Sequence, residues 1–298
     1  MNGAPGPQQA MNTAPGLAAL ALDDAQLAAL LREDAPFGDL TSAMLVPPTR
    51  TGRMRFTARH AMCVAGSEEA LRIIQLAGAQ AELHAASGTH AAPGQLLIEA
   101  TGPAHALLLA WKVAQTLVEA ASGIASATAA IVGLLREAGH TQPVACTRKN
   151  FPGTRAIAAK AVRSGGGVMH RLGLSETLLV FPEHRVFIAP ESLAQAIADL
   201  VRAQPEKRIV VEVGNEQDAL ALARAGAHVL QLERFTPPDV ARLRHKLLEA
   251  GLAVSLAPAG GVTRDNALDY ARAGVDLLVT SAPYFASPAD VQVSIGPC

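Results

Sequence analysis

The second half of the chain alternates short apolar segments with helical segments, and this alternation limits the possible folds more than any other feature. Because the apolar segments have few polar residues on either face, we expect them to be parallel strands that are covered by helices. The sequence therefore predicts a barrel-like or doubly wound α/β domain. The expected strands are PVACT, TLLVF, RIVVEV, AHVLQLE, LAVSLA and VDLLVTS. The first of the expected helices ends near Val162, and the other four cover about 191–202, 218–225, 238–250 and 264–273.

The first part of the chain predicts different elements. Helical spacing of apolar residues begins at Leu17, a strand is expected over Gly52–Val64, and a helix with Ser67 as its N-cap follows. A long Ala-rich helix starts near Pro103. The small residues around Gly123 allow either close packing or a break in that helix.

These patterns divide the chain into a tail and two domains. Residues 1–16 are rich in Pro, Gly and Gln without apolar spacing, which is typical of a flexible tail. We expect residues 17–125 to form an N-terminal α/β domain that includes part of the long helix, and residues 126–285 to form the domain of alternating strands and helices. Residues 286–298 are expected to pack back on the N-terminal domain.

Composition excludes several classes of protein. Half of the residues are apolar and 17% are charged, which excludes a disordered or coiled-coil chain. A net charge of −1 and 3% aromatic residues predict no nucleic-acid partner. Cys63, Cys146 and Cys298 lie far apart without a CxxC motif, so neither a disulfide scaffold nor a zinc site is expected, and a reducing, cytoplasmic location fits. We see no uninterrupted apolar run of ~18 residues and no signal peptide, and so expect no membrane partner.

Positive charge is concentrated in one stretch, residues 147–174, which directly follows the first predicted strand. It contains Arg148, Lys149, His170 and Arg171, and its three consecutive glycines would let a ligand approach the backbone closely. Ligands of α/β folds bind at the carboxyl ends of the strands, and arginine and lysine suit carboxylate and phosphate groups. A solvated basic helix face is the alternative interpretation. The position at a strand end favours an anion site.

Two acids and a glycine pair follow later strands. Glu212 and Glu233 could face Mg²⁺ or a ribose hydroxyl, or could instead form salt bridges with Arg148 or Arg234. The pair Gly260–Gly261 stands between a strand and a helix, where free backbone N–H groups bind phosphate. Together with the basic stretch, these residues indicate a sugar-phosphate ligand.

These motifs together resemble a known family. The patterns TRK-x-x-PG-x-R, GGG-x-x-HR-x-GL, VEV and a glycine pair before a helix, with SGIA and EDxxxGDLT earlier, are similar to quinolinate phosphoribosyltransferase, also called nicotinate-nucleotide pyrophosphorylase. The resemblance extends from about Leu17 to Pro288. The segments TRKNFPGTR, HRLGLSET, LVFPEHR, PAGGV and VTSAPYFASPAD are most similar to the ModD branch of this family, which is associated with molybdenum transport genes.

The resemblance implies an open, incomplete α/β barrel of the type II phosphoribosyltransferase kind, with an N-terminal α/β sandwich-like domain. It implies a homodimer with a shared active site, in which the N-terminal domain of one subunit covers the barrel mouth of the other. It also implies Mg²⁺, phosphoribosyl pyrophosphate and a small anionic acceptor, with release of pyrophosphate.

The resemblance also implies roles for individual residues. Arg148, His170 and Arg171 would bind the acceptor acid, and Lys112 stands where the family has an arginine that reaches the partner's site. Phe181 occupies a substrate-binding position that is lysine in the quinolinate pattern.

The donor would be bound by a second group of residues. Lys149 would contact phosphoribosyl pyrophosphate, while Glu212 and Glu233 would hold the ribose or its Mg²⁺ and stabilise positive charge at the anomeric carbon. Gly260–Gly261 would cradle the 5-phosphate, and Ser281, at the end of the last strand, would complete the substrate-binding set.

Several positions depart from the quinolinate pattern. Phe181 replaces a lysine, Glu233–Arg234 replaces Asp–Asn, Ala259 replaces a serine, and Cys146 replaces an acid. Losing the lysine removes a charge-assisted contact worth ~1.5–3 kcal/mol, or roughly 10- to 150-fold in affinity. We therefore predict an acceptor that is related to quinolinate but has fewer carboxylates or a different ring.

Other functions remain open at this point. The chain could be a non-catalytic binder of anions or nucleotides with a role in molybdenum transport or sensing, or a true decarboxylating quinolinate phosphoribosyltransferase of NAD synthesis. Another phosphate-binding barrel enzyme, such as an aldolase, would need a Schiff-base lysine at a strand end, where only Lys149 stands. Cys146 is predicted to be a buried residue rather than a nucleophile, and Asp39 to cap a turn.

Overall fold

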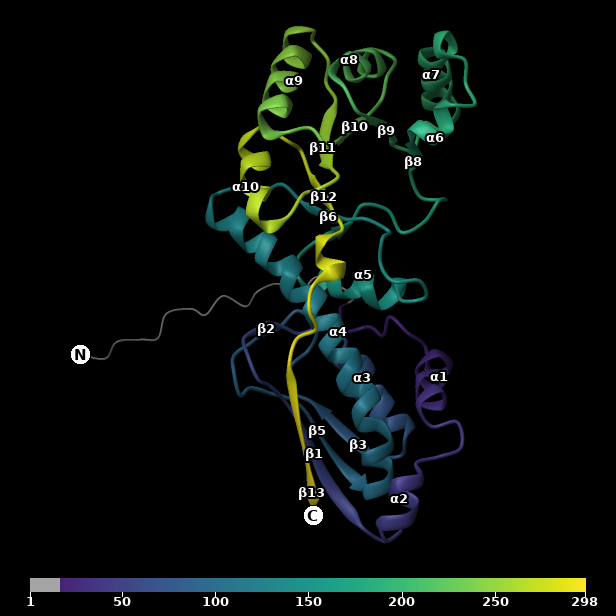
Figure 1. The fold of residues 1–298 in the computed structure, drawn as a ribbon, viewed down its shortest axis with the longest axis vertical. Helices are drawn as coiled ribbons and strands as arrows, with labels where there is room; N and C mark the ends of the chain where they lie inside the picture. The colour runs from purple at the N-terminus through teal and green to yellow at the C-terminus, as the bar shows by residue number, and fades with distance from the viewer. Residues whose placement is uncertain (1–16) are drawn as a thin grey trace, which may run out of the picture.

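The computed structural model describes residues 17–298, and the flexible tail predicted for residues 1–16 lies outside them. Two parts follow one another along the long axis of the molecule (Figure 1). A sheet with helices packed on it forms the lower part, and strands surrounded by helices form the upper part. Helix α4 (Ala104–Glu137) runs through both.

The lower part is built on a four-stranded antiparallel sheet in the order β13–β1–β5–β3. Buried and exposed residues alternate along β1, so one face of the sheet is covered and the other is not. Helices α3 and α4 pack together and against this sheet, and their contact buries Met54, Phe56 and Ile98 completely. The elements are α1 (Asp24–Asp34), α2 (Leu40–Leu45), β1 (Thr51–Ala58), β2 (Met62–Cys63), α3 (Ser67–Leu76), β3 (Gln80–Leu83), β4 (His90–Ala91) and β5 (Leu96–Pro103).

Helix α4 is a continuous helix of 34 residues that supplies side chains to the cores of both parts. It does not break at Gly123, where the chain around Ser287 packs so closely that a β-carbon would overlap the backbone oxygen. By length and composition, α4 is apolar enough to cross a membrane, with a mean hydropathy of 1.6 over an 18-residue window. Its apolar residues face protein cores, since Leu107, Val118 and Leu135 are buried.

The upper part contains seven parallel strands with helices outside them. One sheet has the order β11–β10–β9–β8 and the other β12–β6–β7, and no strand pairing joins the two sheets, so the barrel is open. The sequence predicted six strands and missed β7, which is only two residues long and follows three glycines. The strands are β6 (Val144–Cys146), β7 (Val168–Met169), β8 (Leu178–Val180), β9 (Ile209–Val213), β10 (Val229–Glu233), β11 (Ser255–Ala259) and β12 (Leu278–Thr280).

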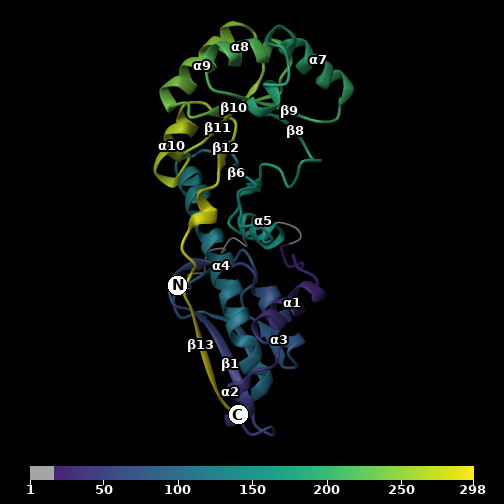
Figure 2. The same ribbon diagram turned by 45° about the vertical axis from the view of Figure 1, so that its right-hand side comes forward.

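The helices of the upper part follow the strands in the order that the sequence predicted. They cover the outer face of the strands, and this contact buries the largest apolar core of the upper part. Figure 2 shows α7 to α10 arranged around the strands. The helices are α5 (Arg155–Ser164), α6 (Pro182–Arg185), η1 (Pro190–Ser192), α7 (Leu193–Ala203), α8 (Glu216–Arg224), α9 (Pro237–Glu249), α10 (Arg264–Arg272) and η2 (Ala282–Phe285).

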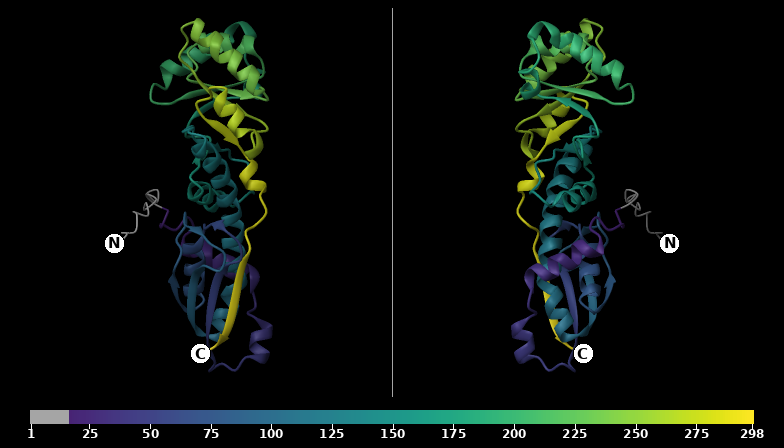
Figure 3. Two further views of the ribbon diagram at one scale, coloured as in Figure 1. Left: turned by 90° about the vertical axis from the view of Figure 1, so that its left-hand side faces the viewer. Right: turned by 90° about the vertical axis from the view of Figure 1, so that its right-hand side faces the viewer.

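The C-terminal segment returns to the lower part. After η2 the chain runs down the molecule, and β13 (Val291–Pro297) pairs antiparallel with β1 from Gly52 to Ala58 (Figure 3). The last strand in sequence is thus an edge strand of the N-terminal sheet.

Three local predictions in the N-terminal part were wrong in detail. Helix α1 begins at Asp24, capped by Asp23, rather than at Leu17. The predicted strand over Gly52–Val64 is two strands, β1 and β2. Gly66, not Ser67, occupies the N-cap of α3, because its left-handed φ of 77° ends the preceding segment. The predicted cap at Asp39 is confirmed: its side chain accepts the Ser42 N–H at the start of α2.

A buried ion cluster joins the two parts of the molecule. The Nζ of Lys160, on α5, lies 2.9 Å from Glu68 Oε2 and 2.8 Å from Glu69 Oε2, both on α3. It also donates to the backbone oxygen of Ala19. Since Lys160 is 5% exposed and Glu69 is fully buried, the cluster ties α5, which follows the basic loop, to the N-terminal part.

Candidate functional site

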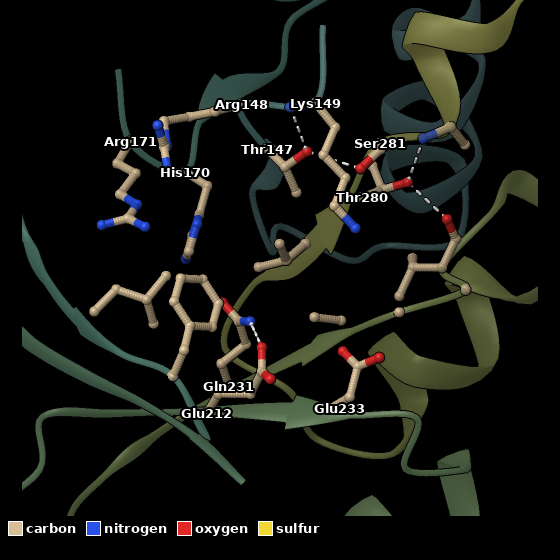
Figure 4. Close-up of a pocket in the computed structure, with 18 of the residues that line it drawn as sticks. Thr147, Arg148, Lys149, His170, Arg171, Glu212, Gln231, Glu233, Thr280 and Ser281 are labelled. Carbon is tan, nitrogen blue, oxygen red and sulfur yellow. Dashed lines mark hydrogen bonds between the residues drawn. The ribbon is translucent and has the colours of Figure 1, made fainter. Parts of the chain in front are cut away.

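A cavity of about 370 Å³ opens at the carboxyl ends of the barrel strands (Figure 4). Each of the seven strands, or the residues that directly follow it, contributes to the cavity lining. Ten of the eleven site residues that the sequence indicated line this one cavity. They are Arg148, Lys149, His170, Arg171, Phe181, Glu212, Glu233, Gly260, Gly261 and Ser281.

The alternation of side chains along each strand explains why these residues meet. On β9 and β10, Val210 and Val229 point into the barrel and form an apolar base. Two residues further on, the next inward positions are Glu212 and Gln231, and Glu233 comes after Gln231. The apolar base therefore gives way to polar groups at the strand ends. The same two-residue step leads from Ala145 to Thr147, from Leu179 to Phe181 and from Val279 to Ser281.

Cationic groups gather on one side of the cavity. Figure 4 shows Arg148, His170 and Arg171 on the side opposite the two carboxylates, with Lys149 nearby. Arg171 is 5% exposed, and its guanidinium carbon lies 5.6 Å from the centre of the Phe181 ring. Burial and the charge of Arg171 hold the pKa of His170 below its ordinary value, which favours the neutral imidazole. This side of the cavity suits an anion with a flat apolar body.

Two carboxylates form the opposite side. Gln231 lies beside Glu212 in the strand register, and its amide donates to Glu212 Oε2 over 2.6 Å. Burial and the negative charge of Glu233 raise the pKa of Glu212 above its ordinary value, although the Gln231 hydrogen bond opposes this. Glu233 lies 3.5 Å from the guanidinium of its neighbour Arg234, whereas no salt bridge joins either acid to Arg148 among the described residues. Glu233 thus forms the salt bridge with Arg234 that the sequence left open, whereas Glu212 has no cationic partner among the described residues.

The glycine pair after β11 makes room for Glu233. A β-carbon at position 260 would lie 2.5 Å from Glu233 Oε1, and the left-handed φ values of Gly260 and Gly261, 75° and 110°, are strained for other residues. Asn266, in the first turn of α10, donates to the Gly261 oxygen over 2.9 Å and accepts the Thr263 N–H. The turn thus places the N-terminus of α10 at the cavity, where a helix favours an anion.

Hydrogen bonds hold the basic loop after β6 in position. The Thr147 and Ser281 hydroxyls lie 2.7 Å apart, and the Lys149 N–H donates to Thr147 Oγ1. The Tyr284 hydroxyl donates to the Thr147 oxygen over 2.8 Å and lies 3.9 Å from the Met169 sulfur. Tyr284 therefore contacts the two turns that carry the cationic residues.

Lys112 is the one predicted site residue that this cavity does not contain. It lies on α4, where its Nζ donates to Gln115 and is 4.2 Å from the centre of the Trp111 ring. There it lines a separate, larger hollow of about 800 Å³ between α1, α4 and the loop at Asn150 and Phe151. The single chain does not bring Lys112 to the cationic and acidic groups.

Cys146 and His184, which lie next to residues of the cavity lining, both have structural surroundings. Cys146 is buried as predicted, and burial raises the pKa of its thiol to about 12, which argues against a nucleophile. His184 stacks on Phe181 with ring centres 5.9 Å apart, and its Nδ1 accepts the Phe181 N–H over 2.9 Å. His184 thereby holds the Phe181 ring in place.

Several polar residues of the lining were not predicted as site residues from the sequence. Gln231 stands inside an apolar strand and Thr147 at the end of another, while Thr263 and Thr280 flank the glycine turn and the last strand. The available signal was the two-residue step, because Gln231 precedes Glu233 by two positions on the same face. Considering the face of each strand end, rather than charge alone, would have found Gln231 and Thr147.

Comparison with protein families identifies the chain. Residues 39–122 match the N-terminal domain of quinolinate phosphoribosyl transferase, and residues 124–294 match its C-terminal domain. The chain belongs to the quinolinate phosphoribosyltransferase family. This family is a pentosyltransferase family of the nicotinate-nucleotide pyrophosphorylase kind, which confirms the resemblance noted in the sequence.

Individual relatives agree with this assignment. The pyrophosphorylase ModD homologue of Rhodobacter capsulatus is 48% identical over 257 residues, covering 85% of this chain and 97% of the relative. The human nicotinate-nucleotide pyrophosphorylase [carboxylating] is 32% identical over 285 residues, covering 93% of each chain. The crystal structure of NadC from Streptococcus pyogenes superposes with a TM-score of 0.83 at 24% identity, covering 92% of this chain and 96% of that one. The architecture is thus the open barrel of type II phosphoribosyltransferases with a separate N-terminal domain, as predicted.

Proposed function

We propose that the protein is a Mg²⁺-dependent phosphoribosyltransferase that uses phosphoribosyl pyrophosphate and releases pyrophosphate. The observation that carries the proposal is the division of one cavity into a cationic side and a side with two carboxylates (Figure 4). A reaction in which a sugar gains positive charge while a highly negative group departs needs both kinds of charge in one place.

The two carboxylates suit the transition state of this transfer. The bond from the anomeric carbon to pyrophosphate breaks, and a bond from that carbon to the acceptor forms. Glu212 and Glu233 would stabilise the positive charge that develops on the ribose, and Lys149 would neutralise the departing pyrophosphate. Gly260 and Gly261, with the N-terminus of α10, would hold the 5-phosphate.

The same carboxylates fit Mg²⁺. This ion is commonly held by one or two carboxylates together with water and substrate phosphates, and Glu212 and Glu233 offer two. Burial, and then the negative charge of Glu233, raise the pKa of Glu212, and a cation between the two acids would favour their ionised forms. Water and substrate phosphates would complete the coordination of such an ion. When bound, Mg²⁺ would neutralise charge on the leaving pyrophosphate.

We propose an acceptor that is a flat ring acid, related to quinolinate but with fewer carboxylates or a different ring. Arg148 and Arg171 can bind a carboxylate, and the N–H of His170 can donate a hydrogen bond to it. Phe181, held between Arg171 and His184, offers an apolar ring face rather than a further cation.

We further propose a homodimer with a shared active site. Lys112 lies on the surface away from its own cavity, so it would act in the cavity of the second subunit. Large apolar side chains on and near α2 are exposed by 76% to 94% in the single chain, which suits a subunit interface. They are Phe37, Leu40, Met44 and Leu45. A cytoplasmic location fits the three free cysteines.

Binding and turnover, measured in parallel, test the proposal. We expect phosphoribosyl pyrophosphate to bind with Mg²⁺ present, as followed by calorimetry, and pyrophosphate to be released when a ring acid is added. The Glu212→Gln variant should still bind the donor but lose turnover by orders of magnitude. Donor binding without release for any ring acid in a broad screen would favour a non-catalytic anion binder.

A further inference from the structure

The backbone of Arg234 is strained at the edge of the cavity. Among residues 17–298, Arg234 is the only residue other than glycine with a positive φ, at 57°. Left-handed backbone disfavours a long side chain, and glycine or asparagine is preferred there. Arg234 directly follows Glu233 at the end of β10, so the strain is located beside a proposed catalytic carboxylate.

The strained backbone has a structural use. The Arg234 N–H donates to the Ala259 oxygen over 3.1 Å, which links the end of β10 to the end of β11 beyond their regular pairing. The chain then turns away, and the Glu233 carboxylate lies against Gly260. Glycine or asparagine could provide this turn at lower cost, so the turn explains the conformation but not the choice of arginine.

The arginine side chain contacts a residue that lines the cavity, although Arg234 itself is not part of the lining. Its Nε lies 3.5 Å from Glu233 Oε1, and Glu233 lines the cavity. The Arg234 side chain is 84% exposed, and an ion pair in such a position contributes little to stability because water screens it. The guanidinium can therefore leave Glu233 for a stronger anion at small energetic cost.

We propose that Arg234 binds a phosphate oxygen of the phosphoribosyl donor and releases Glu233 as the donor enters. This inference rests on the proposed function and names a donor-binding residue for it. The planar fork of the arginine side chain matches the oxygens of a phosphate. Arginine therefore binds a phosphate group more strongly than it binds the exposed carboxylate of Glu233. Departure of the guanidinium also frees the Glu233 carboxylate for the ribose or Mg²⁺. Binding of the phosphoribosyl donor to Arg234 would thus free the Glu233 carboxylate at the same time.

Pyrophosphate binding without metal isolates this contact. Calorimetry with EDTA present should show that pyrophosphate binds Arg234→Gln and Arg234→Asn roughly 10-fold more weakly than the wild type, because each loses one charge-assisted contact. Arg234→Lys should be intermediate. Arg272→Ala is the matched control, since Arg272 is also an exposed arginine paired with a nearby acid but lies on the outer helix α10. Its affinity should stay within twofold of the wild type.

Thermal unfolding separates this role from a structural one. Asparagine tolerates the left-handed backbone, so Arg234→Asn should unfold at a higher temperature than the wild type while binding pyrophosphate more weakly. A structural residue would change the unfolding temperature alone. Wild-type affinity in both Arg234→Gln and Arg234→Asn would overturn the inference and leave the proposed function intact. If wild-type protein bound neither pyrophosphate nor phosphoribosyl pyrophosphate with Mg²⁺, the proposed function itself would fail, and this inference with it.

Discussion

The Glu233 carboxylate occupies the space that a side chain at position 260 would need: a β-carbon on Gly260 would lie 2.5 Å from Glu233 Oε1 and 2.7 Å from Oε2. The ends of two consecutive barrel strands, β10 and β11, therefore fit together only if glycine directly follows the second strand. The glycine turn thus leaves space for the Glu233 carboxylate, in addition to its proposed role of holding the 5-phosphate.

Gly260→Ala should displace Glu233 and lower turnover at least 10-fold. Its left-handed φ of 75° adds backbone strain of about 1 kcal/mol, so the protein should also be slightly less stable. Gly251→Ala is the control, because Gly251 has a similar φ of 67° with no atom near its β-carbon position. Thermal unfolding should show a similar loss of stability in both variants. Turnover should fall only in Gly260→Ala. Full activity of Gly260→Ala would contradict the placement of Glu233.

Glu212→Gln should lose activity yet gain stability at neutral pH. Burial and Glu233 raise the pKa of Glu212, so the folded state holds this proton more tightly than the unfolded state does. The free energy of unfolding then falls as pH rises through the raised pKa, and the ionised carboxylate costs stability above it. Urea unfolding should show a higher midpoint for Glu212→Gln than for the wild type at pH 7, and no difference well below pH 4.5, the ordinary value. A lower midpoint at pH 7 would show that the carboxylate stabilises the fold.

The hydrogen bond from Gln231 should control the titration of Glu212. Since this bond favours the ionised form, Gln231→Leu should raise the pKa of Glu212 further. Carbon-13 NMR of the glutamate carboxyls would follow the titration directly, and the acid limb of the pH–rate profile should move upward with it. A titration that shifts to lower pH, or not at all, would count against the contact.

Tyr284→Phe should weaken substrate binding more than it slows the chemical step. The variant keeps the ring and loses the hydroxyl that donates to Thr147, next to Arg148 and Lys149. We expect KM for the donor to rise by roughly 2- to 10-fold with kcat changed less, because the basic loop would be held less firmly.

Tyr270→Phe is the control for Tyr284→Phe. The Tyr270 hydroxyl also donates to a backbone oxygen over 2.8 Å, but that oxygen belongs to Phe235, which does not line the cavity. Both variants should lose similar stability. If KM rose equally in both, the Tyr284 contact would have no special role in positioning the loop.

Lys160→Met should destabilise the protein strongly. It would leave Glu68 and Glu69 buried without their cation, and breaking a buried ion pair in this way costs about 3–5 kcal/mol. Urea unfolding would measure the loss. Replacing both acids by glutamine in the same variant should recover part of it, and a failure to recover would argue that packing, rather than charge, matters at this junction.

Much of the fold and most of the site were predictable because strands and charges leave clear patterns. The apolar strands fixed the parallel architecture, and Arg148, Lys149, Glu212 and Glu233 stood out as charges at otherwise apolar strand ends. Strand β7 was not predicted because it has only two residues, directly after three glycines, and so shows no periodic pattern. Gln231 was not predicted as a site residue because it carries no charge. Only its position on the inward face of β10 indicates that it lines the cavity.

Other features depend on contacts that a single sequence does not display. The N-cap role of Gly66 depends on its backbone conformation, although Ser67 is the better cap by residue type. The left-handed backbone of Arg234 and its link to Ala259 arise only when β10 and β11 pair. The placement of Lys112 outside the cavity depends on how α4 packs in the folded chain, which the local sequence pattern does not describe.

Phosphorus NMR of the donor tests the central claim most directly. Purified protein, Mg²⁺ and phosphoribosyl pyrophosphate would be incubated with quinolinate and, separately, with ring acids that carry one carboxylate. We predict that pyrophosphate appears only when an acceptor is present, and faster with a one-carboxylate acid than with quinolinate. Fastest release with quinolinate would contradict the proposed acceptor, and no release with any ring acid, while the donor stays bound, would contradict phosphoribosyl transfer itself.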